Sequence, residues 1–171
     1  MVYALLPAGG SALAAEPSFE MVNGWGPLTW EMNVADAKAA LTRAAVEFEE
    51  MTIPGGDGPA LFLTRAGWET CFVGFDAEGR MIAVTLVSPR FKAREDAAVY
   101  QADLEKRYGP GEEDPRELVD DGYTDVKTVF WRNDTTVLTL ATTYYMPQGD
   151  WEVEERFAPA GATNADDGDG K

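Results

Sequence analysis

Residues 69–88 read Glu-Thr-Cys-Phe-Val-Gly-Phe-Asp-Ala-Glu-Gly-Arg-Met-Ile-Ala-Val-Thr-Leu-Val-Ser, and this stretch decides the fold class. Apolar side chains alternate on both sides of the central Asp-Ala-Glu-Gly, as they do in strands with one buried face. Gly79 is the last residue of that turn, where a left-handed backbone suits glycine. The stretch predicts a β-hairpin of residues 69–75 and 80–88, with Cys71, Val73 and Phe75 on one strand face and Ile82, Val84 and Leu86 on the other strand's matching face.

A second hairpin follows later in the chain. Residues 127–132 and 136–145 flank Asn133-Asp134 and are rich in Thr, Val, Tyr and Phe, which favour strands. Residues 60–64 and 151–153 are expected to form short additional strands. The acidic segment 112–125 is expected to be a loop.

Each hairpin is preceded by a predicted helix. The first begins at Asn33, a good N-cap, and its apolar positions recur at helical spacing as far as Phe48. The second covers residues 93–108, where Ala97, Tyr100, Leu104 and Tyr108 share one face. Gly109-Pro110 ends it.

The fold class predicted from this order is α+β. We expect two tandem helix-plus-β-hairpin units that form one antiparallel sheet, with the helices packed on one face. Residues 21–158 should form a single domain. Residues 1–20 are expected to be a leader-like or disordered arm, and residues 159–171 a disordered acidic tail.

The composition excludes several kinds of chemistry. The chain of 171 residues carries a formal net charge of −16, which disfavours binding to nucleic acid and favours a basic protein as partner. It has no histidine and a single cysteine, Cys71, so histidine-dependent catalysis and Cys/His zinc sites cannot form. No run is long and apolar enough to predict a membrane span. We expect no cofactor and no metal site.

The first residues bear on localisation. The stretch is apolar and ends in small residues, and Ala12-Leu13-Ala14 fits the pattern of a signal-peptidase site, although a basic region before it is missing. A periplasmic or secreted protein is therefore expected, or a cytoplasmic one if the start is genuine.

Two segments carry a family resemblance. Residues 27–37 enter the first helix as Pro-Leu-Thr-Trp-Glu-Met-Asn-Val-Ala-Asp-Ala, and the second helix ends with Tyr100, Leu104 and Tyr108-Gly109-Pro110 before Trp131 in a hairpin. Together they resemble the α+β units of SmpA/OmlA-type outer-membrane assembly lipoproteins and of the tandem-repeat β-lactamase inhibitor proteins. The resemblance spans roughly residues 27–145. It implies helices on a sheet and a protein-binding role.

Carboxylate pairs are the remaining catalytic candidates. Asp76 with Glu78, Asp120 with Asp121, and Glu154 with Glu155 are close in sequence, but each pair falls in a predicted turn, loop or tail where acids are solvated. A glycosidase needs two carboxyls held across a cleft, one with a raised pKa. We therefore expect no catalytic residues and no enzyme activity, with a weak carboxylate-based hydrolase as one alternative.

Aromatic residues at the ends of elements are the candidate partner-binding residues: Trp25, Trp151, Tyr144 and Tyr145. The function expected from the sequence is that of a noncatalytic bacterial envelope protein acting as a protein-interaction or inhibitor-like module. The other alternative is a small-molecule or cation-binding carrier, which would show an apolar pocket with a few converging polar groups.

Overall fold

The computed structural model describes residue 19 and residues 22–52, 57–114, 124–146 and 148–161. The first half of the chain forms helix α1 (Val34–Arg43) and strands β1 (Phe48–Thr52), β2 (Pro59–Leu63), β3 (Thr70–Phe75) and β4 (Met81–Val87). The second half forms helix α2 (Arg94–Tyr108) and strands β5 (Glu112–Glu113), β6 (Thr124–Arg132), β7 (Thr136–Tyr145) and β8 (Asp150–Pro159). The predicted α+β class is confirmed.

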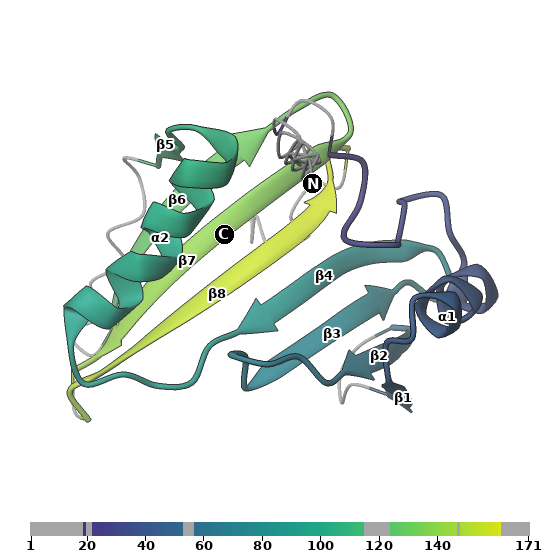
Figure 1. Cartoon of the computed structure of the whole chain (residues 1–171), viewed down its shortest axis with the longest axis horizontal. Helices are drawn as coiled ribbons and strands as arrows, with labels where there is room; N and C mark the ends of the chain where they lie inside the picture. The colour runs from purple at the N-terminus through teal and green to yellow at the C-terminus, as the bar shows by residue number, and fades with distance from the viewer. Residues whose placement is uncertain (1–18, 20–21, 53–56, 115–123, 147, 162–171) are drawn as a thin grey trace, which may run out of the picture.

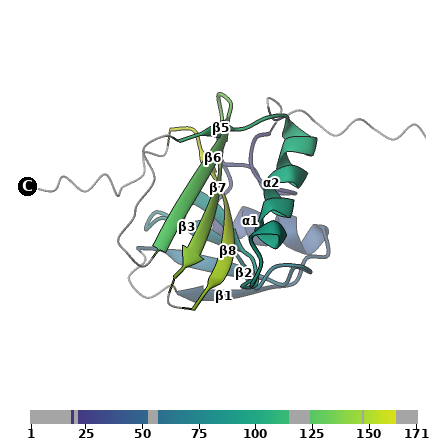
Figure 2. The same ribbon diagram turned by 90° about the vertical axis from the view of Figure 1, so that its left-hand side faces the viewer.

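All eight strands belong to one antiparallel sheet with the order β1-β2-β3-β4-β8-β7-β6-β5. Each half therefore contributes four consecutive strands, and the halves meet where β4 pairs with β8. Figure 1 shows α2 lying over β6 and β7, and α1 lying at the opposite part of the sheet beside β2 and β3. Figure 2 shows how strongly the sheet twists between its two halves.

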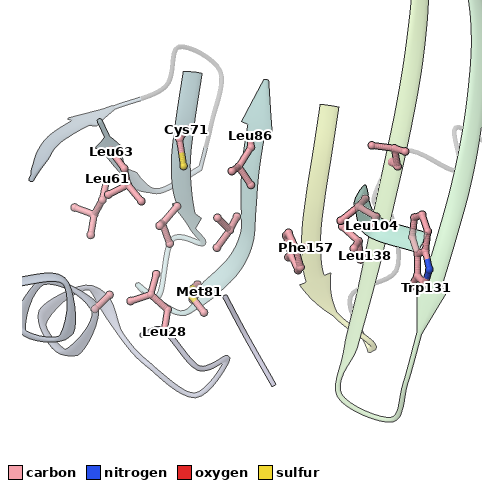
Figure 3. Close-up of a cluster of buried hydrophobic side chains, with 14 of the residues drawn as sticks. Leu28, Leu61, Leu63, Cys71, Met81, Leu86, Leu104, Trp131, Leu138 and Phe157 are labelled. Carbon is pink, nitrogen blue, oxygen red and sulfur yellow. The ribbon is translucent and has the colours of Figure 1, made fainter. Parts of the chain in front are cut away.

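Two rows of paired residues cross the sheet on the same face. The first is Leu61, Val73, Val84, Phe157, Leu138 and Trp131. The second is Cys71, Leu86, Glu155, Leu140 and Val129. These apolar side chains form one core cluster with Ala37 and Leu41 of α1 and Ala97 and Leu104 of α2. Figure 3 shows this cluster extending from Leu61 and Cys71 in one half to Leu138 and Trp131 in the other.

The local signals explain most element boundaries. The side chain of Asn33 accepts hydrogen bonds from the backbone N–H groups of Ala35 and Asp36, as expected of an N-cap. Gly109 ends α2 at a positive φ of 82°. The hairpin at residues 76–79 closes through a hydrogen bond from the Gly79 N–H to the Asp76 carbonyl.

Several sequence predictions were wrong in extent. The first helix ends at Arg43 because Ala45 adopts a positive φ of 54° and turns the chain into β1, so Phe48 lies in a strand. The segment 112–125 is not all loop, since it contains β5 and the start of β6. The last strand covers Asp150–Pro159 rather than three residues, and the chain is therefore still in the sheet where the tail was expected to begin.

The predicted face of β4 also needs correction. Ile82 does not share the buried face of Val84 and Leu86, since it is 41% exposed. The register shifts by one residue between Gly74 and Phe75 of β3, so Met81 takes the buried position instead and is 2% exposed. A β-bulge of this kind leaves the extra residue outside the ladder.

Candidate functional site

The most anomalous residue of the core is Glu155 in the middle of β8. It lies between Leu86 of β4 and Leu140 of β7 in the register of the sheet. Its neighbours on the same face of its own strand are Val153 and Phe157, which are both buried. Glu155 itself is only 4% exposed. A carboxyl thus occupies a central position of an otherwise apolar surface, where unpaired charge is costly.

No partner satisfies this carboxyl. Among the described residues, none forms a hydrogen bond or an ion pair with Glu155. Burial raises the pKa of Glu155 to about 7, and the Arg107 and Arg65 guanidiniums act in the opposite direction without offsetting it. Asp103 raises the pKa further through its own negative charge. A group with this environment changes its charge near neutral pH.

Glu155 lines a pocket of about 510 Å³ between the sheet, the end of α2 and the segment 22–29. Its apolar lining comes from both ends of the described chain, with Trp25 and Leu28 on one side and Phe157 on the other. Arg65 and Arg107 also line it. The pocket combines apolar side chains with a few converging charged groups, an arrangement found in small-molecule sites.

Each arginine is held by a neighbour. The Arg65 guanidinium lies 4.9 Å from the centre of the Trp25 ring, at a cation–π distance. The Arg107 Nη2 donates to Asp103 Oδ2 at 2.8 Å, one helical turn earlier in α2. The Arg107 Nε is buried and has no hydrogen-bond acceptor among the described residues. The pocket therefore contains a buried N–H donor without an acceptor among the described residues, beside the Glu155 carboxyl.

The segment 22–29, which lines the pocket, is hydrogen-bonded at its start to the turn between β6 and β7. Asn133 Nδ2 donates to the carbonyls of Phe19 and Val22, at 2.5 and 2.9 Å. The hydroxyls of Thr135 and Thr136 both donate to the Val22 carbonyl at 2.9 Å. Asn133, which the sequence placed in a turn, thus also anchors the residues that cover the site.

A tight turn continues this cover. The backbone groups of Trp25 and Leu28 pair with each other in both directions at 3.0 Å. Gly24 adopts a φ of +126° there, and a Cβ at this position would lie 2.0 Å from the Leu28 carbonyl oxygen. Only glycine fits a backbone this close to another.

The predicted partner-binding residues are distributed over three places. Trp25 lines the pocket of Glu155 and is half-buried. Tyr144 and Trp151 pair across β7 and β8, with ring centres 4.6 Å apart, and Arg94 lies 5.7 Å from the Trp151 ring centre. Tyr145 is the next residue along β7 and therefore points to the other face, where its hydroxyl donates to Glu152 Oε1 at 3.0 Å.

The structure describes two of the three candidate acid pairs. Glu154 and Glu155 are successive residues of one strand, so their side chains point to opposite faces of the sheet. Asp76 accepts hydrogen bonds from the Arg80 backbone and side chain within its turn, at 2.8 and 2.7 Å. Asp120 and Asp121 lie outside the described residues. The expectation that Glu155 is merely solvated was wrong, because β8 continues through it.

The sequence analysis missed Arg65 and Arg107 as site residues and considered Glu155 only as a member of a solvated acid pair. The signal for Glu155 was available, since Trp151, Val153 and Phe157 alternate as a strand and place it on their apolar face. Nothing in the local sequence marks Arg65 or Arg107, because they approach Glu155 from α2 and from the segment before β3, which are distant from β8 in the chain.

Two further observations limit the kinds of site. No cluster of three or more metal-ligating side chains occurs among the residues that the structure describes. Within the same part of the chain, neither helix has the length and apolar character needed to cross a bilayer. Comparison with protein-family models, with curated proteins and with solved structures found no match to this chain.

Proposed function

We propose that this protein is a noncatalytic binding protein that holds a small organic molecule in the pocket of Glu155. The observation that carries the proposal is that Glu155 is buried, has no hydrogen-bond or ion-pair partner among the described residues, and lines a pocket of about 510 Å³. A protein that uses this cavity only for packing would gain stability from an apolar residue at position 155, because burying an unpaired carboxyl is unfavourable. A bound ligand would give the carboxyl the partner it lacks.

Of the functions expected from the sequence, the carrier of a small molecule thus takes precedence over the protein-interaction module.

We also propose that each helix and its four following strands form one unit, with both helices on the core face of the sheet. Support comes from the mirrored strand order about the β4–β8 pair and from the shared core cluster. The pocket then lies at the junction, with Arg65 from the first unit and Arg107 and Glu155 from the second.

A matched pair of tryptophan variants tests the proposal. A library of small metabolites is screened by thermal shift against the full chain, and each hit is checked on Trp25→Ala and Trp151→Ala. Both tryptophans are half-buried, but only Trp25 lines the pocket of Glu155. Hits that persist in Trp151→Ala and are lost in Trp25→Ala support the proposal. A library without hits, or hits lost only in Trp151→Ala, would overturn it.

Protein recognition is the second candidate. It is favoured by the half-buried Tyr144 and Trp151 pair, since aromatic residues at a rim are frequent anchors in interfaces. The net charge of −16 would steer a basic partner toward the molecule. In a pull-down from the source cell's envelope fraction, this candidate requires a partner that is retained at low salt, released as salt rises, and lost with Trp151→Ala. Retention of that partner by Trp151→Ala would contradict it.

A further inference from the structure

Two arginines line the pocket of Glu155, and one of them has a buried N–H without an acceptor among the described residues. The Arg107 Nε is buried without an acceptor, and only the Nη2 of the same guanidinium is bonded to Asp103. Arg65 forms no ion pair with any described residue and is stacked on Trp25. Planar guanidiniums present forked N–H donors that match a carboxylate. The buried Arg107 Nε therefore lacks an acceptor that an anion in the pocket would supply, and the exposed Arg65 guanidinium lines the same pocket.

Glu155 adds to this set in one of its two protonation states. Its carboxyl lies between Leu86 and Leu140 and has no ion-pair partner, so its environment favours the neutral acid. A neutral carboxyl has one O–H donor. In this state Arg65, Arg107 and Glu155 can all donate hydrogen bonds to a ligand. The neutral acid also does not repel an anion.

Apolar side chains form part of the remaining lining, beside the polar Asn23 and Thr29. Val22, Pro27 and Leu28 come from the covering segment, and Phe157 comes from the sheet. Such walls accommodate a hydrocarbon or aromatic body but give no hydrogen bonds. A ligand that fits both parts has a compact anionic head and an apolar body.

We propose that the pocket binds a small organic carboxylate whose oxygens accept hydrogen bonds from Arg65, Arg107 and the protonated Glu155. This inference rests on the proposed function and names the class of its ligand. A cationic ligand would pair with an ionised Glu155 but would face the two guanidiniums at the same time, which disfavours it. The overall charge of the chain is opposite to that of the pocket, so the specificity comes from these three residues.

Binding of a carboxylate should be linked to the uptake of a proton by Glu155. Carboxylate binding favours the neutral form of Glu155, and by linkage a more protonated Glu155 binds the carboxylate more tightly. The charged groups that shift the pKa of Glu155 are Arg107 and Asp103 of α2 and Arg65, which precedes β3. Two further titratable groups, Cys71 of β3 and Tyr100 of α2, lie near enough for Glu155 to raise their pKa values. Burial raises the pKa of both Cys71 and Tyr100, so those two remain neutral near pH 7.

Three probes with the same ring and different charge test the inference. Benzoate, benzamide and benzylamine are titrated into the full chain by calorimetry at pH 6 and pH 8. We expect benzoate to bind most tightly, and its affinity to fall by about tenfold between the two pH values as Glu155 ionises. Measurements in buffers of different ionisation enthalpy should show proton uptake on benzoate binding. A preference for benzylamine, equal binding of benzamide, affinity that rises with pH, or no binding of benzoate would each overturn the inference.

Variants assign the effect to the pocket. Glu155→Gln should bind benzoate with the same affinity at both pH values, whereas Arg107→Gln and Arg65→Gln should each weaken binding by roughly tenfold. Glu154→Gln is the matched control, because the same change falls on the next residue but faces away from the pocket. It should behave as the wild type; loss of binding in Glu154→Gln alone would contradict the assignment. Library hits that are cations, lost in Trp25→Ala, would sink this inference while leaving the proposed function intact.

Discussion

Glu155 of β8 lies directly opposite Leu86 of β4 on the buried face of the sheet, at the one place where the two halves of the chain pair. Where β4 pairs with β8, Glu155 thus places a carboxyl between the apolar residues Val153 and Phe157 of its own strand. Arg107 and Asp103 of α2 and Arg65 before β3 shift its pKa through space, and none of these three residues forms an ion pair with it. The consequences concern stability, titration, binding and reactivity.

Stability should depend on pH through Glu155. Its pKa in the folded protein is about 7, above the ordinary 4.5, so the folded state binds the proton more tightly than the unfolded state does. This contribution to stability is fully present below about pH 4.5 and is lost as pH rises through about 7. In the Glu155→Gln variant the side chain is neutral at every pH, so the cost of a buried ionised carboxyl at pH 8 is absent. The variant should therefore be more stable than the wild type at pH 8 by up to roughly 3 kcal/mol. Urea unfolding from pH 5 to pH 8 measures the difference.

The control for this experiment is Glu69→Gln, at an exposed position before β3. Its free energy of unfolding should follow that of the wild type at every pH. A wild-type protein and a Glu155→Gln variant whose curves stay parallel from pH 5 to pH 8 would mean that Glu155 titrates normally.

The two arginines should set the titration of Glu155 unequally. Arg107 has the larger effect of the two in lowering the pKa of Glu155. Arg107→Gln should therefore raise the titration midpoint of the carboxyl more than Arg65→Gln does, and both should raise it relative to the wild type. Carbon-detected NMR of the Glu155 carboxyl measures this shift. Arg132→Gln, at an exposed position at the end of β6, should leave the midpoint unchanged.

The cover of the pocket should depend on Gly24 and much less on Gly26. An added Cβ at Gly24 would meet the Leu28 carbonyl oxygen at 2.0 Å, whereas one at Gly26 would meet nothing within 4 Å. Gly26 has a φ of +56°, within the left-handed region that other residues can adopt at modest cost, whereas the φ of +126° at Gly24 lies outside it, so the backbone term also penalises Gly24→Ala more. Gly24→Ala should cost about 1–3 kcal/mol more than Gly26→Ala. It should also abolish benzoate binding, which Gly26→Ala retains; equal behaviour of the two variants would refute the role of this turn.

Cys71 should be inert in the folded protein. It is 2% exposed, and burial raises the pKa of its thiol to about 11. Because the thiolate is the reactive species, iodoacetamide at pH 8 should leave the native protein unmodified and alkylate it fully in urea. Mass spectrometry reads both states. Rapid alkylation of the native protein would show that this part of the core opens.

The sequence predicted those elements in which local and tertiary preferences agree. The two hairpins of β3 with β4 and of β6 with β7 were visible as alternating apolar residues, and α2 as a helical stripe closed by Gly109. Strand β1 was missed because Glu49, Glu50 and Thr52 give it an exposed, polar pattern at the edge of the sheet. The start of β1 also carries Phe48, which completed the helical spacing of the preceding segment.

Strand β8 shows why the candidate site was not predicted. Its central residues read Val-Glu-Glu-Arg-Phe, which is polar enough to suggest a solvated end of the chain. Its position between β4 and β7 buries alternate residues regardless of their polarity, and Glu155 falls on the buried side. The strand order depends on pairing between residues about seventy positions apart, as for Leu86 and Glu155, and local periodicity contains no information about it.

The titration midpoint of the Glu155 carboxyl is the most direct measurement for the whole account. Carbon-detected NMR on the full chain should show one glutamate that ionises at about pH 7, is absent from spectra of Glu155→Gln, and shifts to higher pH when benzoate is added. A Glu155 resonance that titrates at the ordinary value of 4.5 and ignores benzoate would contradict the account, because the carboxyl would then be solvated and have no ligand to meet.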